Sequence, residues 1–304
     1  MKTTFTGINI ADLCGWFGLS RQAYYQHKKQ TKKKFTQEEI ILSEIHKIRE
    51  KHPRLGTRKL YKKIEPLKQE HKIKIGRDAL FNLLNENKLL IRKRKRRVRT
   101  TQSSHWYRKY PNLIKNIELK EKNQLWVSDI TYWRIKENFV YISLITDAFS
   151  HKIVGWNVAE TLEGLETVQA LKMALSGFFN EPESHFQLIH HSDRGIQYCQ
   201  YQYVKLLQDN NIQISMTQTS DPRDNAIAER INGILKEEYL VDSNIETISE
   251  AKDKLSKVID LYNNERPHMS IGNNTPEEIH NSNQKKEKLW KNYYKKNPNF
   301  VKQI

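Results

Sequence analysis

The sequence predicts an all-helical, strongly basic region followed by an α/β domain. Two observations carry this prediction. Residues 1–110 contain 29 Lys and Arg against 9 Asp and Glu, a net charge of +20, whereas residues 111–304 contain 23 and 26, a net charge of −3. From about residue 120, segments with strand character alternate with segments of helical periodicity, which is typical of a sheet flanked by helices.

Composition narrows the function classes. Hydrophobic residues make up 37% of the 304 residues, which is enough to bury a core and excludes a disordered polycation. The localised positive charge favours a polyanion partner, most often nucleic acid, over charge kept for solubility. The two cysteines, Cys14 and Cys199, exclude a disulfide framework and a four-cysteine zinc site. With no long apolar run and no signal peptide, we expect a cytoplasmic protein without a membrane segment.

The first 34 residues predict a small helix-turn-helix-like segment and a basic spacer. Two short helices fit residues 8–27, with Gly18 between them and Ser20 as the N-cap of the second. A plain amphipathic helix pair explains the same pattern equally well. The run KKQTKKK, residues 28–34, reads as the spacer.

Residues 35–91 predict a helical DNA-binding domain. Isoleucines at three- and four-residue spacing follow Thr36, and Pro53 should end that helix. A second short helix should end near Pro66, and a third, rich in leucine, should end around residues 85–87. Three short basic helices fit a DNA reader. Arg77 and Asn82 lie on the polar face of the third helix, which is either a base-contacting face or an ordinary solvated one.

Residues 92–119 predict a basic linker. Seven of the eight side chains in RKRKRRVR, residues 92–99, are cationic, and no packed core holds that density of like charge. A localisation signal or a plain linker is the simpler explanation, but the position between two foldable regions favours a linker that contacts DNA phosphates. The expected contacts are Arg92, Lys93, Arg94, Lys95, Arg96 and Arg97.

Residues 120–284 predict the α/β domain, and residues 285–304 a basic, aromatic tail. The expected order is three strands, helix, strand, helix, strand, helix. In that order the elements are 125–133, 139–149, 152–160, 167–179, 186–193, 202–210, 213–217 and 225–240.

Three acidic residues occupy positions that indicate a function. Asp129 lies inside the first expected strand, where aspartate is rare, and Asp193 ends a buried strand. Glu229 lies on the last expected helix, and it shares a polar face with Asn225, Asn232 and Lys236 that should look toward a ligand. Singly, each acid is more often structural or solvated. Together they fit a metal site or a glycosidase pair as alternatives to surface charge.

The strings around these acids resemble a known family. WVSDITYW, LITDAFSHKIVGW, HHSDRGIQY, SDPRDNAIAE and YNNERPHMSIGNNTPEE, with 35 residues between Asp193 and Glu229, resemble the OrfB transposase of the insertion-sequence-three family. Its catalytic core is a DDE integrase core like that of retroviral integrases. HPRLGTRKLY and IGRDALFNLLNENKL resemble the helical domain that precedes this core.

The resemblance implies a ribonuclease H-like fold, a mixed five-stranded sheet flanked by helices. It implies that Asp129, Asp193 and Glu229 are the catalytic acids and metal ligands of an enzyme that cleaves and joins DNA strands at element ends. Hard oxygen ligands suit Mg²⁺ or Mn²⁺, and two ions can share an in-line displacement, with Asp129 bridging both. His190 and His191 then serve in packing or hydrogen bonding rather than in a zinc site.

The expected partners are double-stranded DNA, as terminal inverted repeats and target, and further copies of the chain on that DNA. An upstream OrfA-type protein is a further candidate partner. Asn225, Lys236 and Arg266 are further candidate DNA contacts, although Asn225 also suits a helix cap and Pro267 next to Arg266 a helix break. Two other functions compete: a DNA-binding regulator with a silent core, and a nuclease for RNA–DNA hybrids. The three acids disfavour the first, and the basic N-terminal region disfavours the second.

Overall fold

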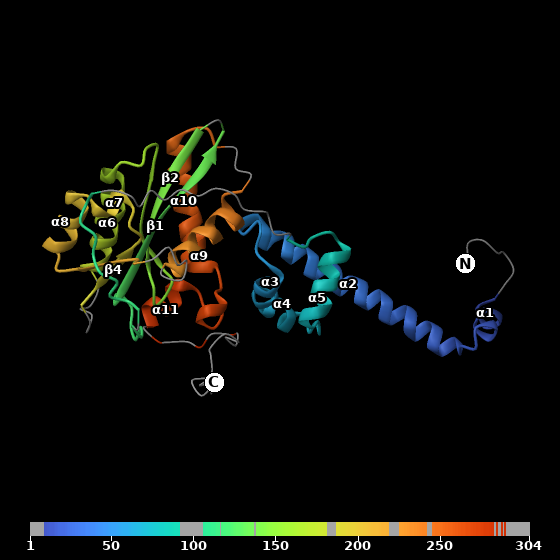
Figure 1. Cartoon of the computed structure of the whole chain (residues 1–304). Coiled ribbons are helices and arrows are strands. Elements are labelled where there is room, and N and C mark those ends of the chain that lie inside the picture. The colour runs from blue at the N-terminus through green and yellow to red at the C-terminus, as the bar shows by residue number, and fades with distance from the viewer. Residues whose placement is uncertain are drawn as a thin grey trace, which may run out of the picture. The chain divides into compact units, whose positions relative to one another are not determined.

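The structure is a computed structural model that describes residues 9–91, 106–115, 117–136, 138–180, 187–218, 225–241, 245–282, 284, 287 and 289. Contacts divide the chain into two compact units (Figure 1). The first unit holds Met1–Lys51 and Leu55–Ile91, and the second holds His52–Arg54 and Arg92–Ile304. None of the described helices combines the length and the apolar character needed to cross a membrane.

The first unit is helical, as its isoleucine and leucine spacing predicts. Its helices are α1 (Ile10–Trp16), α2 (Arg21–Lys51), α3 (Thr57–Lys63), α4 (Glu65–Glu70) and α5 (Arg77–Glu86). The second half of α2 packs Ile41 and Ile45 against Leu60 of α3 and Leu80 and Leu84 of α5. This apolar cluster is the core of the unit, and burial of its side chains stabilises the helices more than their propensity does.

One expectation for this unit was wrong. Residues 28–34 are not a spacer, because they lie inside the continuous α2, where Lys and Gln are good helix formers and no Gly or Pro interrupts residues 21–51. The second short helix does end near Pro66, since α3 ends at Lys63. Pro66 itself stands in the first turn of the next helix, α4, where its missing N–H costs nothing. Gly18 does form the left-handed turn (φ 65°) that follows α1, and Ser20 Oγ caps α2 by accepting from Ala23 N (3.1 Å).

The second unit is built on one five-stranded sheet in the order β3-β2-β1-β4-β5. The strands are β1 (Leu125–Ile135), β2 (Asn138–Asp147), β3 (Ile153–Ala159), β4 (Ile189–Ser192) and β5 (Gln213–Met216). β1, β2 and β3 pair antiparallel, whereas β4 and β5 add in parallel to β1. Every expected strand is present, and the mixed five-stranded sheet confirms the ribonuclease H-like fold.

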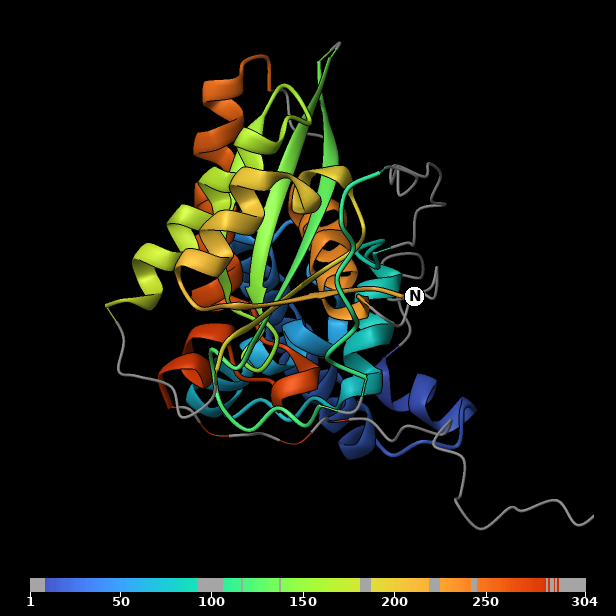
Figure 2. The ribbon, with the colours of Figure 1, turned by 60° about the vertical axis from the view of Figure 1, so that its left-hand side comes forward.

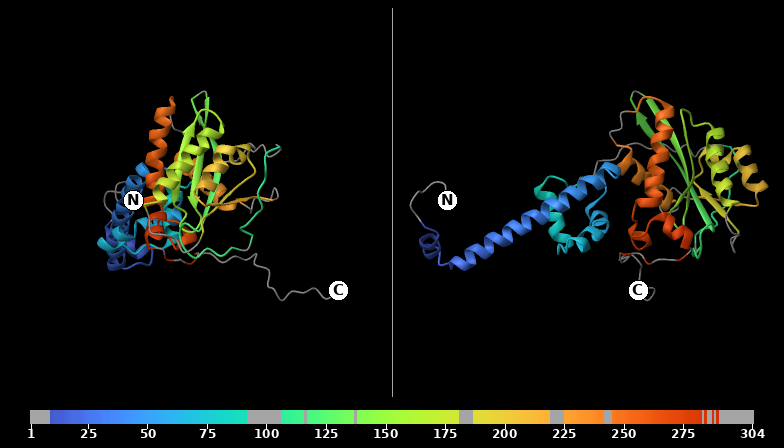
Figure 3. Two further views of the ribbon diagram at one scale, coloured as in Figure 1. Left: turned by 90° about the vertical axis from the view of Figure 1, so that its left-hand side faces the viewer. Right: turned by 180° about the vertical axis from the view of Figure 1, so that it is seen from behind.

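Helices cover both faces of the sheet (Figures 1 and 3). On one face, α6 (Gly164–Phe178), α7 (Ile196–Cys199) and α8 (Tyr201–Asp209) pack on a cluster that includes Trp126 and Ile145. On the other, α9 (Ala226–Ile234) and α10 (Ile248–Asp260) pack on a cluster that includes Ile142 and Val158. Each of these last two helices runs on into a π-helical turn, η1 (Leu235–Tyr239) and η2 (Leu261–Glu265). The 3₁₀ turn η3 (Met269–Ile271) and α11 (Pro276–Ser282) follow.

Candidate catalytic acid cluster

Strand register brings Asp129 and Asp193 together. β1 and β4 run parallel with Val127 opposite His191, so two residues further along Asp129 and Asp193 occupy neighbouring positions. Asp193 directly follows β4, which ends at Ser192. Glu229 lies in the first turn of α9, which packs on β1. The three acids, far apart in sequence, therefore meet where β4 ends, the kind of sheet edge at which α/β sites form.

Asp129 is a partly buried carboxylate with few donors. Its Oδ1 accepts from Ile130 N (2.9 Å), and its Oδ2 accepts from Asn232 Nδ2 (2.7 Å). The pKa of Asp129 is raised from 3.8 to about 7. Burial is the largest cause, the charges of Asp193 and Glu229 act in the same direction, and the two hydrogen bonds oppose the shift. Mutual repulsion of the acids is therefore a physical property of this site.

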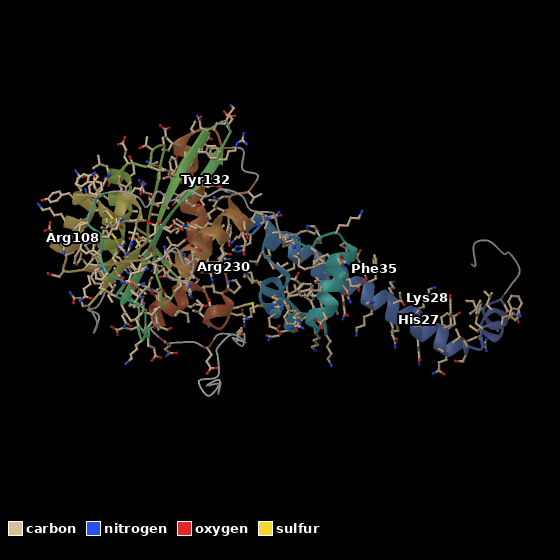
Figure 4. The ribbon with its side chains drawn as sticks, in the orientation of Figure 1. His27, Lys28, Phe35, Arg108, Tyr132 and Arg230 are labelled. Carbon is tan, nitrogen blue, oxygen red and sulfur yellow. The ribbon has the colours of Figure 1, made fainter. Side chains whose placement is uncertain are left out.

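The polar face of α9 holds the helix against β1. Asn225 Nδ2 donates to Ser128 O (2.9 Å), Asn232 binds Asp129, and Lys236 Nζ donates to Thr131 Oγ1 (3.2 Å). Lys236 Nζ also lies 3.7 Å from the centre of the Tyr132 ring. The shared face expected from the spacing is confirmed, and most of it contacts the strand that carries Asp129. Figure 4 labels Tyr132 on β1 and Arg230, the exposed neighbour of Glu229 on α9.

A buried hydrogen-bonded group fixes the strands behind the acids. Ser128 Oγ and the Tyr203 hydroxyl both lie within hydrogen-bond distance of His190 Nε2, at 2.7 and 2.9 Å. Burial lowers the pKa of His190 to about 3, so this imidazole is neutral at physiological pH. His191 Nδ1 lies 2.8 Å from Ser215 Oγ on β5. Both histidines therefore serve hydrogen bonding inside the sheet, one of the two roles expected for them.

Gly195 has a different role from the tight turn that its place after the strand suggests. Its φ of −63° is accessible to any residue. A Cβ here would instead lie 2.9 Å from Asp193 Oδ1, the atom that accepts from Gly195 N at 2.9 Å. A methyl group here would therefore displace the Asp193 carboxylate, which folds back onto this backbone.

Arg266 corrects one expectation. Its side chain is 1% exposed, and Nε and Nη2 donate to Glu238 (2.8 and 2.7 Å) while Nη1 lies 2.8 Å from His268 Nε2. A guanidinium whose donors are used inside the protein does not face DNA. It forms an internal ion pair that joins η1 to the segment after η2.

The other candidate DNA contacts have varied positions. Asn225 is buried, and Lys236 is partly buried between Thr131 and Tyr132. Arg77 and Asn82 lie exposed on α5, where Arg77 Nε pairs with Asp78 (2.8 Å). Residues Arg92, Lys93, Arg94, Lys95, Arg96 and Arg97 fall outside the described residues.

The chemistry of the cluster fits a divalent cation. All three acids supply hard oxygen donors, and the charges of Asp193 and Glu229 act on Asp129. Asn232 Oδ1, beside Asp129, is a buried acceptor without a hydrogen-bond partner. Within the described residues no group of three or more His, Cys, Asp or Glu side chains is assembled tightly enough to hold a metal. The acids are thus near one another without forming a closed coordination shell.

Sequence reasoning missed several supporting residues. Ser128 lies in an expected strand and Tyr203 in an expected helix. Serine and tyrosine are ordinary at such positions, so nothing in the sequence marks the two residues as partners of His190. The helical spacing of Asn232 from Glu229 indicated that the two residues share a face. The spacing did not reveal that Asn232 donates a hydrogen bond to Asp129. Gly195 lies within HHSDRGIQY, but only the structure shows how close a side chain at this position would come to Asp193.

Comparison with known proteins agrees with this geometry. Residues 120–222 and 210–276 match integrase core domain families. The chain is 32% identical over 269 residues to the insertion element IS600 uncharacterized 31 kDa protein of Shigella sonnei, covering 87% of this chain and 96% of that one. It is 28% identical to the transposase for insertion sequence element IS629 of Shigella sonnei, covering 88% and 90% of the two chains.

A third relative is the transposase for insertion sequence element IS904 of Lactococcus lactis. The two chains are 32% identical over 175 residues, which cover 57% of this chain and 68% of that one. The residues that match the two integrase core domain families include all three acids, the sheet and α9. The chain belongs to the insertion-sequence transposases that carry a DDE integrase core.

Proposed function

We propose that Asp129, Asp193 and Glu229 are the catalytic acids of this transposase and that they hold two divalent cations, Mg²⁺ or Mn²⁺. The observation that carries the proposal is the position of Asp129, partly buried in β1 with its pKa raised to about 7 and with the charges of Asp193 and Glu229 acting on it. Because the charges of both other acids act on Asp129, it is the acid that would contact both ions. When bound, the cations stabilise the attacking and leaving oxygens of an in-line phosphoryl displacement.

The residues of the chain prepare this chemistry. Asn232 and Ile130 N orient the Asp129 carboxylate, and Gly195 N orients that of Asp193. The Ser128–His190–Tyr203 group keeps β1 and β4 in register beneath them. Glu229 is exposed on α9, so it completes the site from the solvent side, where a DNA strand arrives.

We propose double-stranded DNA, as the terminal repeats of the element and a target, for the substrate. The net charge of +20 in residues 1–110 supplies the phosphate contacts, and residues 120–284 supply the catalytic core. In this division, residues 1–34 and 35–91 bind DNA ends and residues 92–119 link them to the core. Two ends must meet in the reaction, so we propose that several copies act together on DNA, with or without an OrfA-type partner, in the bacterial cytoplasm at the nucleoid.

The test is a strand-transfer assay on labelled DNA bearing the element ends, with Mg²⁺ or Mn²⁺, with and without an OrfA-type protein. We expect joined products from the wild type and none from Asp129→Asn, Asp193→Asn or Glu229→Gln. Asp209→Asn, an exposed acid at the end of α8, is the matched control and should keep full activity. Joined products from any of the three acid variants would contradict the assignment.

A further inference from the structure

The segment WYRKY, Trp106–Tyr110, presents an aromatic surface that the site described above does not use. The Trp106 side chain is 86% exposed, and its ring stacks on that of Tyr107 with 4.3 Å between ring centres and 19° between planes. An indole held flat against a second ring, with its outer face open to solvent, is an unusual use of tryptophan in a soluble protein.

The segment Trp106–Tyr110, called the platform below, is packed against the core of the second unit. Tyr107 and Tyr110 are partly buried and pack against the core cluster that contains Trp126 and Tyr203. The Arg108 guanidinium carbon lies 5.2 Å from the centre of the Tyr110 ring. Because the two tyrosines are fixed in the core, the exposed indole has a defined orientation and loses little freedom when a ligand stacks on it.

Hydrogen bonds place the platform at the edge of the sheet where the acids lie. Pro111 O accepts from Met216 N (3.2 Å), and Leu113 N donates to Ser215 Oγ (2.9 Å), so the segment runs antiparallel to β5. Residues 106–110 therefore lie beyond the carboxyl end of β5. β4 pairs with β5 as far as Ser192 opposite Met216, and Asp193 follows directly after β4. Figure 2 gives a further view of this sheet.

Electrostatics gives the same neighbourhood. The charges of both Lys109 and Asp193 act on the Cys199 thiol, whose pKa burial raises to about 11. Arg108 and Lys109 are exposed, and the segment contains no acid. Figure 4 labels Arg108 on the second unit. An aromatic face flanked by two cations matches the chemistry of a nucleobase and its adjoining phosphates.

We propose that Trp106–Tyr110 is a stacking platform for an unpaired base of the DNA strand that enters the acid cluster, with Arg108 and Lys109 contacting the phosphates on either side. A base inside a duplex has no free face, so the ligand is a single strand or a frayed end. This inference rests on the proposed function for its substrate, since it takes the DNA end as the ligand. Stacking of one base on an aromatic side chain contributes about 1–3 kcal/mol, which corresponds to a change in affinity of roughly five- to 140-fold.

The test uses the full chain and oligonucleotides that carry 2-aminopurine, whose fluorescence falls when it stacks. One DNA has the probe in a two-base overhang, a second is single-stranded, and a third is a blunt duplex with the probe paired. Binding is measured with EDTA, so that no strand is cut. The variants are Trp106→Ala, Trp106→Phe and Phe179→Ala, an exposed aromatic residue at the end of α6 that serves as the matched control.

We expect the wild type, Trp106→Phe and Phe179→Ala to quench the overhang and single-strand probes. Trp106→Ala should lose the quench and bind these two DNAs about tenfold more weakly, with unchanged binding to the blunt duplex. Equal quenching by Trp106→Ala, or an equal loss on the blunt duplex, would overturn the proposal. Wild-type affinity for all DNAs combined with weakened self-association in Trp106→Ala would also overturn it, because the platform would then be a protein contact.

Failure of the proposed function is distinguishable from failure of this inference. Asp129→Asn abolishes strand transfer in the first assay, but it should quench the overhang probe like the wild type, since stacking needs no catalysis. A wild type that transfers no strands while Trp106 still quenches the probe would refute the catalytic assignment and leave the platform supported.

Discussion

Asp129 and Asp147 are two aspartates of the same sheet with opposite surroundings. Asp147, at the end of β2, is fully buried and accepts from Asn123 N (2.9 Å), Ser150 N (2.8 Å) and Ser150 Oγ (2.6 Å), with His280 Nδ1 at 3.6 Å. Asp129, inside β1, is partly open and accepts two hydrogen bonds, and two other acids act on it.

This difference indicates which of the two carboxylates can bind a cation. Asp147 has its oxygens occupied by donors from its own turn and from Asn123, so the fold stabilises its negative charge. Asp129 keeps free oxygen lone pairs and repels its neighbours, so a cation stabilises it more than any group now present. The structure therefore shows Asp147 as a structural acid and supports a functional role for Asp129.

The largest expected effect concerns Asp129. Asp129→Asn keeps the size of the side chain but removes its charge, so strand transfer should fall by at least about 10³-fold, because a metal ligand in phosphoryl transfer contributes several kcal/mol. Its melting temperature in EDTA should not fall, since one of three crowded acids is gone. A variant that loses activity only because it unfolds, as seen by circular dichroism, would contradict the comparison.

Asp147→Asn should show the reverse pattern. The amide cannot accept all three hydrogen bonds, and its NH₂ group meets donors, so we expect the free energy of unfolding to drop by about 2–4 kcal/mol. The activity per folded molecule should stay close to that of the wild type. Chemical denaturation measures the loss, and Ser150→Ala, which removes one donor only, should lose less. An Asp147→Asn protein of wild-type stability but without activity would reverse the assignment of the two acids.

Gly195→Ala tests the position of Asp193, the acid that follows β4. The new methyl group would lie 2.9 Å from Asp193 Oδ1, so the carboxylate must move. We expect kcat to fall about ten- to a hundredfold, because small displacements of reacting groups are costly, with little change in DNA affinity. Gly177→Ala is the control, since a methyl group there meets nothing within 4 Å. Unchanged kcat in Gly195→Ala would show that Asp193 does not need this position.

The smallest effect concerns the pH profile. Because the pKa of Asp129 is raised from 3.8 to about 7, the folded state keeps a proton that the unfolded chain loses above about pH 4. The stability of the metal-free wild type should therefore decrease between about pH 4 and 7, and this part of the decrease should be absent in Asp129→Asn. Activity should rise with pH over the range in which Asp129 ionises.

Asn232→Ala shifts the same profile. The hydrogen bond from Asn232 lowers the pKa of Asp129, so its loss should move the rise in activity to higher pH. Asn264→Ala, on η2, should leave the profile unchanged. A profile that moves to lower pH in Asn232→Ala would contradict the electrostatics described for this cluster.

Much of the fold follows from local pattern, and the exceptions have physical causes. The strands around Asp129 and Asp193 were predictable because β-branched and aromatic runs end at polar residues. The length of α2 was not, since a run of lysines reads as a solvated linker although lysine favours helix. The three acids could be selected from sequence by position and spacing. The burial of Arg266 could not, because its partner Glu238 lies 28 residues away and only the packed fold joins them.

Calorimetric titration of the full-length protein with Mn²⁺ in the absence of DNA tests the central claim most directly. We expect the wild type to bind Mn²⁺, and we expect this binding to strengthen as the pH rises through 7. The Asp129→Asn variant should not bind Mn²⁺. Ser150→Ala, altered beside Asp147, should bind like the wild type. Equal Mn²⁺ binding by the wild type and Asp129→Asn would contradict the account, since the acids that the sheet and α9 bring together would then not be the metal ligands.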